Sequence, residues 1–132
     1  MGCGRQNNIA RGNQAIAHGE DAIRLSPVDP EMAFFLGGFA IANYTAGRYA
    51  ESAHWAEEAL RLRPGFQGAQ RMRCASLAQA GRVDEARLFL ETIRCEQPRI
   101  SIEWIKASVP YQTPELMERY LEGMRKAGLN ET

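Results

Sequence analysis

Apolar and polar residues recur along the chain with the spacing of amphipathic helices. Apolar positions return every three or four residues, and no convincing period-two alternation is flanked by turn signals. All six prolines can be placed at helix boundaries, where proline is tolerated. The pattern therefore predicts an all-α chain with seven helices, near residues 9–25, 31–45, 49–62, 66–79, 83–96, 101–108 and 114–127.

Local signals support these helix boundaries. Asp29 and Thr113 each precede a proline and have the form of N-caps. Gly47 and Gly81 fall where one helix must stop and the chain must reverse, which is the role of a left-handed C-terminal cap. Connections of three or four residues force neighbouring helices to be antiparallel, so we expect helical hairpins.

The sequence repeats itself. Residues 47–64 match residues 81–98 at a shift of 34, with Gly, Arg, Glu and Pro at equivalent positions, small residues at Ser52 and Ala86, and an aromatic at Trp55 and Phe89. A third copy, residues 10–27, matches at a shift of 37. Because fixed periods of this length mark helical repeat proteins, the period decides the predicted fold.

The repeats resemble those of the tetratricopeptide repeat (TPR) family, whose units are 34-residue helix–turn–helix hairpins. Residues 33–64 fit best, through Gly47, Tyr49, Ala59, Leu60 and Pro64. Residues 67–98 are a weaker copy: Cys74, Gly81, Ala86 and Pro98 match, whereas Gln70 and Arg73 fill usually apolar places and Val83 replaces an aromatic. Residues 10–27 match only a second helix.

This resemblance implies a single TPR-like domain over residues 1–132, folded as an α-α superhelix or right-handed solenoid. Its parts would be a partial repeat at 9–27, repeats at 31–64 and 65–98, and C-terminal capping helices at 99–128. In such a fold the first helices line a concave groove that receives an extended peptide or a helix. By position the groove would present Phe34, Gly37, Ile41, Tyr44 and Thr45 from one repeat, and Gly68, Arg71, Ala75, Ala78 and Gln79 from the next. The alternative is that some of these residues simply pack against adjacent helices.

The whole chain is more loosely similar to the C-terminal repeat region of bacterial signalling proteins. In those proteins a class III nucleotide cyclase domain or a winged-helix DNA-binding domain precedes the repeats, and neither is present here. The resemblance implies a regulatory module cut from a longer protein. It favours a protein-interaction scaffold with a protein or peptide partner.

The two ends of the predicted solenoid differ. The last helix places an apolar stripe opposite a charged face, as a terminal cap would: the stripe is Leu116, Met117, Tyr120, Leu121 and Met124. Ile102, Ile105 and Val109 would sit beneath it. The first helix lacks such a cap. We therefore expect that residues 1–8 fold back, that a missing domain covers it, or that another copy does, and the last possibility makes self-association the alternative function.

Charge excludes a wholesale nucleic-acid binder, because 16 basic and 16 acidic residues cancel. One stretch is nevertheless unbalanced, since no acid lies between Glu58 and Asp84. A basic patch is one interpretation, and neutralisation by acids of neighbouring helices is the favoured one. The arginines concerned are Arg61, Arg63, Arg71, Arg73 and Arg82. No stacking aromatics interleave them, which argues against single-strand binding.

No residue set for catalysis stands out, so we expect neither an enzyme nor a cofactor. His18 and His54 have no histidine or cysteine one helical turn away, as a metal site would need. No GK[ST] follows Gly37–Gly38, so these glycines either allow a close helix contact or clear the groove floor. No apolar run is long enough to span a membrane. No secretory signal is recognisable, and we expect a cytoplasmic protein whose three cysteines (Cys3, Cys74 and Cys95) are unpaired.

Overall fold

The computed structural model describes residues 30–109 and 113–132. Within these two ranges the chain is all-α and contains no strand. Its helices are α2 (Pro30–Thr45), α3 (Tyr49–Leu62), α4 (Gln67–Gln79), α5 (Val83–Glu96), α6 (Ile102–Ser108) and α7 (Pro114–Ala127). Six predicted helices are thus confirmed to within one residue at each end, and the seventh, at 9–25, lies outside the described residues.

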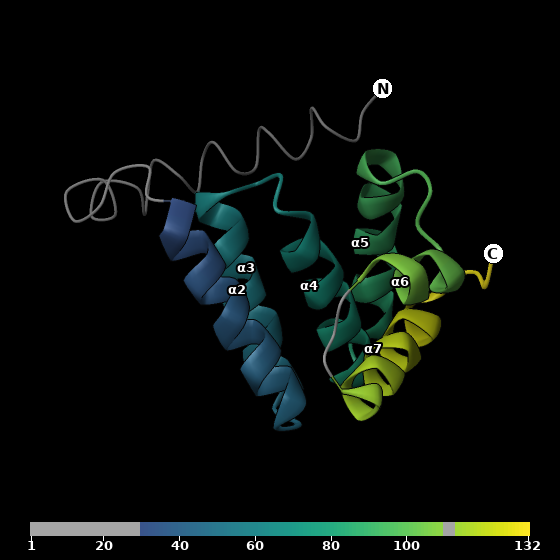
Figure 1. Ribbon diagram of the computed structural model, residues 1–132, viewed down its shortest axis with the longest axis horizontal. Helices are drawn as coiled ribbons and strands as arrows, with labels where there is room; N and C mark the ends of the chain where they lie inside the picture. The colour runs from purple at the N-terminus through teal and green to yellow at the C-terminus, as the bar shows by residue number, and fades with distance from the viewer. Residues whose placement is uncertain (1–29, 110–112) are drawn as a thin grey trace.

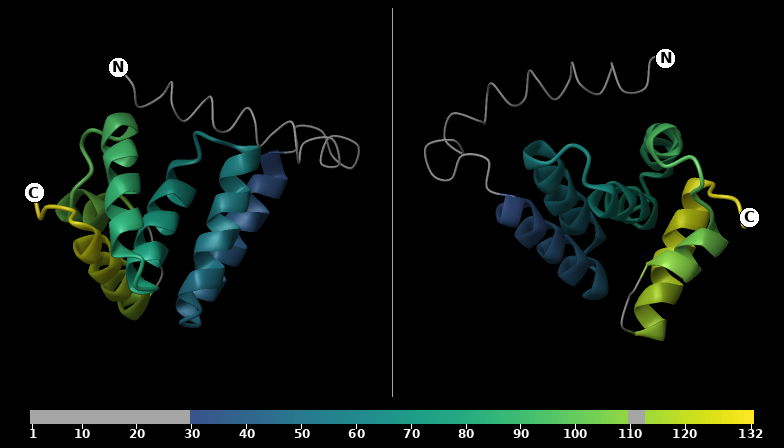
Figure 2. Two further views of the ribbon diagram at one scale, coloured as in Figure 1. Left: turned by 180° about the vertical axis from the view of Figure 1, so that it is seen from behind. Right: turned by 45° about the horizontal axis from the view of Figure 1, so that its top comes forward.

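The helices form two successive hairpins followed by a C-terminal helix pair. α2 and α3 lie side by side, α4 stands in the middle, and α5 packs on its far side (Figure 1). The view from behind shows the same order (Figure 2). α7 does not continue this order, because it packs mainly against α4 and only secondarily against α5 and α6.

The two hairpins turn by the same mechanism. Gly47 and Gly81 adopt φ angles of 82° and 89°, a left-handed conformation that costs glycine little. The N–H of Gly47 donates to Tyr44 O at 3.0 Å, and the N–H of Arg48 donates to Asn43 O at 2.8 Å. The same pair of bonds recurs 34 residues later at Gly81. Both helices therefore end in a Schellman motif, which confirms the predicted capping role of the two glycines.

Small side chains let neighbouring helices approach closely. Ser52 and Ala86, which the sequence places inward, are both fully buried. The Ser52 hydroxyl donates to Ala40 O at 2.6 Å, and the Ser76 hydroxyl donates to Ser52 Oγ at 2.8 Å. These two bonds join α2, α3 and α4 through buried oxygens whose hydrogen-bonding capacity is thereby satisfied.

α7 has the amphipathic character that its sequence predicts. Thr113 caps its first turn by accepting a hydrogen bond from the N–H of Leu116 at 3.2 Å. Tyr120, Leu121 and Met124 are buried. The acidic and basic side chains of the opposite face are exposed, namely Glu115, Glu118, Glu122, Arg125 and Lys126. Ile102, Ile105 and Val109, expected beneath this helix, are buried as well.

A glycine marks the place where α7 crosses α4 and the end of α2. A Cβ atom on Gly123 would lie 2.7 Å from Tyr44 Oη and 2.9 Å from Ala75 O. The Tyr44 hydroxyl donates to Arg119 O at 2.6 Å, and the Arg119 guanidinium donates to Thr45 O at 2.6 Å. α7 therefore both packs against the C-terminal end of α2 and satisfies one of its free carbonyls.

Gly123→Ala is expected to lower the free energy of unfolding by about 1–2 kcal/mol, because the added methyl overlaps a backbone carbonyl that cannot turn away. Gly38→Ala is the matched control. A Cβ atom there meets nothing within 4 Å, so the substitution should be neutral or raise the free energy of unfolding by up to about 1 kcal/mol. Urea unfolding followed by circular dichroism measures both, and equal midpoints for the two variants would contradict the close crossing.

Candidate binding groove

An open cavity of about 260 Å³ lies between the N-terminal parts of α2 and α4. We call this cavity the groove pocket. Apolar side chains and three glycines form most of its wall. The residues lining it are Phe34, Gly37, Gly38, Ile41, Phe66, Gly68, Ala69, Arg71, Met72 and Val109.

The glycines and Phe66 determine the shape of the groove pocket. A Cβ atom on Gly37 would lie 3.0 Å from the Phe66 ring, and one on Gly68 would lie 3.4 Å from it. Phe34 meets the same ring edge-on, with 5.1 Å between the ring centroids. A Cβ atom on Gly38 meets nothing within 4 Å. Of the two roles considered for this glycine pair, Gly37 thus allows a close contact, whereas Gly38 borders open space.

The predicted groove residues divide into two sets. Phe34, Gly37, Ile41 and Arg71 line the groove pocket, and so does Gly68. Four other predicted positions, Tyr44, Thr45, Ala75 and Gln79, contact α7 instead. Ala78 is buried in the core. Tyr44 is fully buried, and burial raises the pKa of its hydroxyl well above the ordinary value. For this second set, packing against a neighbouring helix is the interpretation that the structure supports.

Sequence reasoning missed several residues of the groove pocket. Phe66, at the N-cap position of α4, precedes the residues of this helix that were expected to face the groove. Val109 reaches the pocket from the end of α6, and no local signal in the sequence connects it with α2.

Among the described residues, Arg71 is the one charged residue that lines the groove pocket. It is only 9% exposed. Its guanidinium donates to Gln97 Oε1 at 2.8 Å and to Tyr120 Oη at 3.1 Å, and it lies 5.4 Å from the centre of the Trp104 ring. All these neighbours are neutral, and no acidic side chain in the described ranges forms an ion pair with Arg71.

Two glutamines connect Arg71 with a carboxylate. Gln97 donates to Gln70 Oε1 at 2.8 Å, and Gln70 donates to Glu96 Oε1 at 2.6 Å. The chain of amides orients these dipoles toward the guanidinium and strengthens each bond in it. It does not bring the Glu96 carboxylate into contact with the Arg71 charge.

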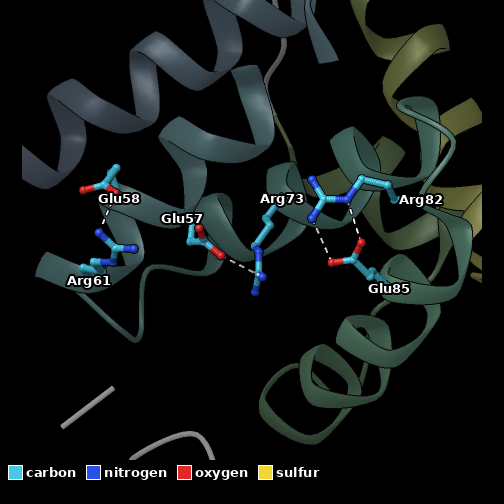
Figure 3. A network of polar contacts seen from close by, with 6 residues as sticks. All are labelled: Glu57, Glu58, Arg61, Arg73, Arg82 and Glu85. Carbon is cyan, nitrogen blue, oxygen red and sulfur yellow. Dashed lines mark hydrogen bonds and ion pairs between the residues drawn. The ribbon is translucent and has the colours of Figure 1, made fainter. Parts of the chain in front are cut away.

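Three of the remaining arginines of the unbalanced stretch are paired with acids. The pairs, drawn in Figure 3, are Arg61–Glu58 at 2.6 Å, Arg73–Glu57 at 2.9 Å and Arg82–Glu85 at 2.6 Å. The favoured interpretation, neutralisation by acids of neighbouring helices, holds for Arg73, whose partner lies on α3, whereas Arg61 and Arg82 are paired with an acid three residues along the chain. Arg63 differs, because it forms no ion pair in the described part of the chain.

The described residues contain no cluster of three side chains that could hold a metal ion. Nor does any helix in the ranges 30–109 and 113–132 have the length and apolar character needed to cross a membrane. His54 lies beside Trp55, with 5.0 Å between the ring centroids. His18 lies outside the described residues. Comparison of the sequence with known protein families and with curated proteins finds no match.

The cysteines depart in part from expectation. Cys74 is free and buried, as a small inward residue should be. Cys95, exposed in the last turn of α5, is disulfide-bonded, so the expectation that all three cysteines are unpaired is wrong for this residue. Its exposed position leaves the sulfur open to such a bond. The cysteines therefore no longer support the cytoplasmic expectation.

Burial raises the pKa of the Cys74 thiol from 9.0 to about 12. Between these values the unfolded chain loses the proton while the folded chain keeps it, so the free energy of unfolding falls as pH rises above 9. Comparing urea unfolding at pH 8 and pH 10.5, we expect the wild type to lose about 1–2 kcal/mol more than Cys74→Ala. All other titrating groups are shared by the two proteins. Equal losses in both would contradict a protonated, buried thiol.

Proposed function

We propose that the protein is an interaction module that binds a peptide or helix of a partner protein in the groove pocket. The observation that carries the proposal is the pocket itself. It is open, largely apolar and lined by Phe34, Gly37, Ile41 and Arg71, four of the positions expected to face a partner. Concave apolar sites with a few polar groups are where proteins usually bind ligands. We propose no enzymatic activity, because no nucleophile, base and anion-stabilising group can be placed together among residues 30–109 and 113–132.

We further propose that the scaffold is a TPR-like solenoid. Its support is the 34-residue spacing of the two hairpins and of their two Schellman turns at Gly47 and Gly81. The small buried residues Ser52 and Ala86, also 34 positions apart, lie at equivalent places in α3 and α5. The resemblance to bacterial signalling proteins supports a regulatory module of a larger signalling protein.

Filling the groove pocket tests the interaction function. We expect Gly38→Leu to fold normally and to place its side chain in the pocket, because a Cβ atom there meets nothing within 4 Å. Peptides are first selected with the wild-type protein from a phage-displayed library of random 12-residue segments. Their binding to Gly38→Leu should be at least tenfold weaker.

Ala42→Leu is the matched control, because it adds the same side chain one helical turn further along α2, at an exposed position that does not line the pocket. Binding to this variant should equal that of the wild type. Failure to select any peptide, or undiminished binding to Gly38→Leu, would contradict a binding role for the pocket.

Self-association is the second candidate function, and an exposed apolar patch on α2 favours it. Phe35 and Phe39 are 64% and 46% exposed, and their rings stack with 5.4 Å between centroids. Phe39 also meets the half-buried Trp55. Clustered exposed aromatics mark interaction sites more often than single exposed apolar residues do.

If this patch joins two copies, sedimentation velocity should show a dimer whose population rises with concentration. The double variant Phe35→Ser/Phe39→Ser should then sediment as a monomer. Leu88→Ser is the control, since Leu88 is 74% exposed on α5, and it should leave the dimer intact. A wild-type protein that stays monomeric at every concentration would exclude self-association.

A further inference from the structure

The charged side chains that line the groove pocket or stack on its aromatic rings, in the described part of the chain, are arginines. Arg71 lines its wall, and no acidic side chain among the described residues does. Arg63 lies at the rim, with its guanidinium 5.1 Å from the centre of the Phe34 ring and 5.6 Å from that of Phe66. Both rings line the pocket. An arginine stacked on aromatic faces keeps its N–H donors in the plane of the guanidinium, where they can bind a carboxylate side-on.

The surroundings of Arg71 are unusual for a buried charge. Buried arginines are normally paired directly with an anion, since removing a charge from water is costly without a partner. Arg71 instead contacts Gln97, Tyr120 and Trp104, all neutral, and the Glu96 carboxylate is reached only through two amides. A carboxylate entering the groove pocket would supply the direct counter-charge that the described residues do not provide.

We propose that the groove pocket binds a segment of a partner protein in which an aspartate or glutamate side chain adjoins a large apolar residue. This inference rests on the proposed interaction function. The apolar residue lies between Phe34, Ile41 and Phe66, over the space that Gly38 leaves open. The acidic side chain pairs with Arg71 at the pocket wall or with Arg63 at its rim.

The placement of the two arginines favours acidic side chains inside the partner segment as the ligand, rather than the carboxylate at the partner's C-terminus. Arg63 follows the last residue of α3 and stacks on the Phe34 and Phe66 rings, whereas Arg71 lies in the second turn of α4 and lines the wall, so the two charges occupy two separate positions at the pocket. A segment running beside α4 passes both, and acidic residues at two points along it can each find a partner. A single terminal carboxylate can satisfy only one position.

The composition of selected peptides provides the first test. The displayed 12-residue segments are fused at both ends, so none has a free carboxyl terminus. Segments selected by the wild type should be enriched in Asp or Glu beside Leu, Ile, Phe or Met, and this enrichment should be absent with Arg71→Gln. Circular dichroism shows whether that variant folds, because Arg71 also contacts α7 through Tyr120.

Arg63→Gln provides a second variant that does not depend on a buried residue, since Arg63 is exposed. Fluorescence anisotropy with one selected peptide measures the affinity. We expect Arg63→Gln to weaken binding about fivefold, and Glu→Gln at the enriched acidic position of the peptide to weaken it by a similar or larger factor. When both changes are combined, the total loss of affinity should be smaller than the product of the two single losses, because both changes remove the same interaction. Arg87→Gln, an exposed arginine on α5 outside the pocket, should leave the affinity unchanged.

Three results would overturn this inference. If the selected peptides lack acidic residues but bind Gly38→Leu more weakly than the wild type, the proposed function stands and the acidic preference is excluded. Peptides that bind only with a free carboxyl terminus, in a second library displayed with that end open, would assign the arginines to a chain end. Equal weakening by Arg63→Gln and Arg87→Gln would show a general effect of net charge.

Discussion

The close crossing of α7 over α4 at Gly123 is the contact on which much of the described structure depends. Because Gly123 has no side chain, the backbone of α7 comes within contact distance of Ala75 and the Tyr44 hydroxyl. That approach buries Tyr44 and brings Arg119 to the last two carbonyls of α2, those of Tyr44 and Thr45. It also decides the extent of the groove, since α7 occupies the half near the C-terminal ends of α2 and α4 and leaves the half near their N-terminal ends open as the groove pocket.

The same crossing determines the environment of Arg71. Tyr120, one turn before Gly123 on the buried side of α7, is placed so that its hydroxyl accepts a hydrogen bond from the Arg71 guanidinium. Gln97, at the C-cap position of α5, accepts a second hydrogen bond from the Arg71 guanidinium. From Gln97 the hydrogen bonds lead through Gln70 to Glu96. Polar groups from α4, α5 and α7 are thus joined in one buried chain. Such a chain is favourable only when its members are hydrogen-bonded, which ties the position of α7 to that of the pocket wall.

Helices could be predicted from the sequence because their signals are local. Thr113 before a proline and glycine at position 47 identify a helix start and a helix end without reference to the rest of the chain. The partner of α7 could not be predicted in this way. Its apolar stripe predicts a terminal cap with one buried face, but it does not say which helix that face covers, and the structure packs it mainly on α4. For that reason Phe34 and Ile41 line an open pocket as expected, while Tyr44 and Gln79 contact α7.

The glycines of the groove pocket show that space there is maintained at some cost to the helices. Each glycine inside a helix lowers its stability by up to about 1 kcal/mol relative to alanine. Packing explains this cost at Gly37, where a methyl group would press on the Phe66 ring, but it does not explain Gly38, where a methyl group would meet nothing. A residue that lowers helix stability without improving any internal contact fits a position whose empty space is used by another molecule. Gly38 thus links the packing of α2 to the binding function proposed for the groove.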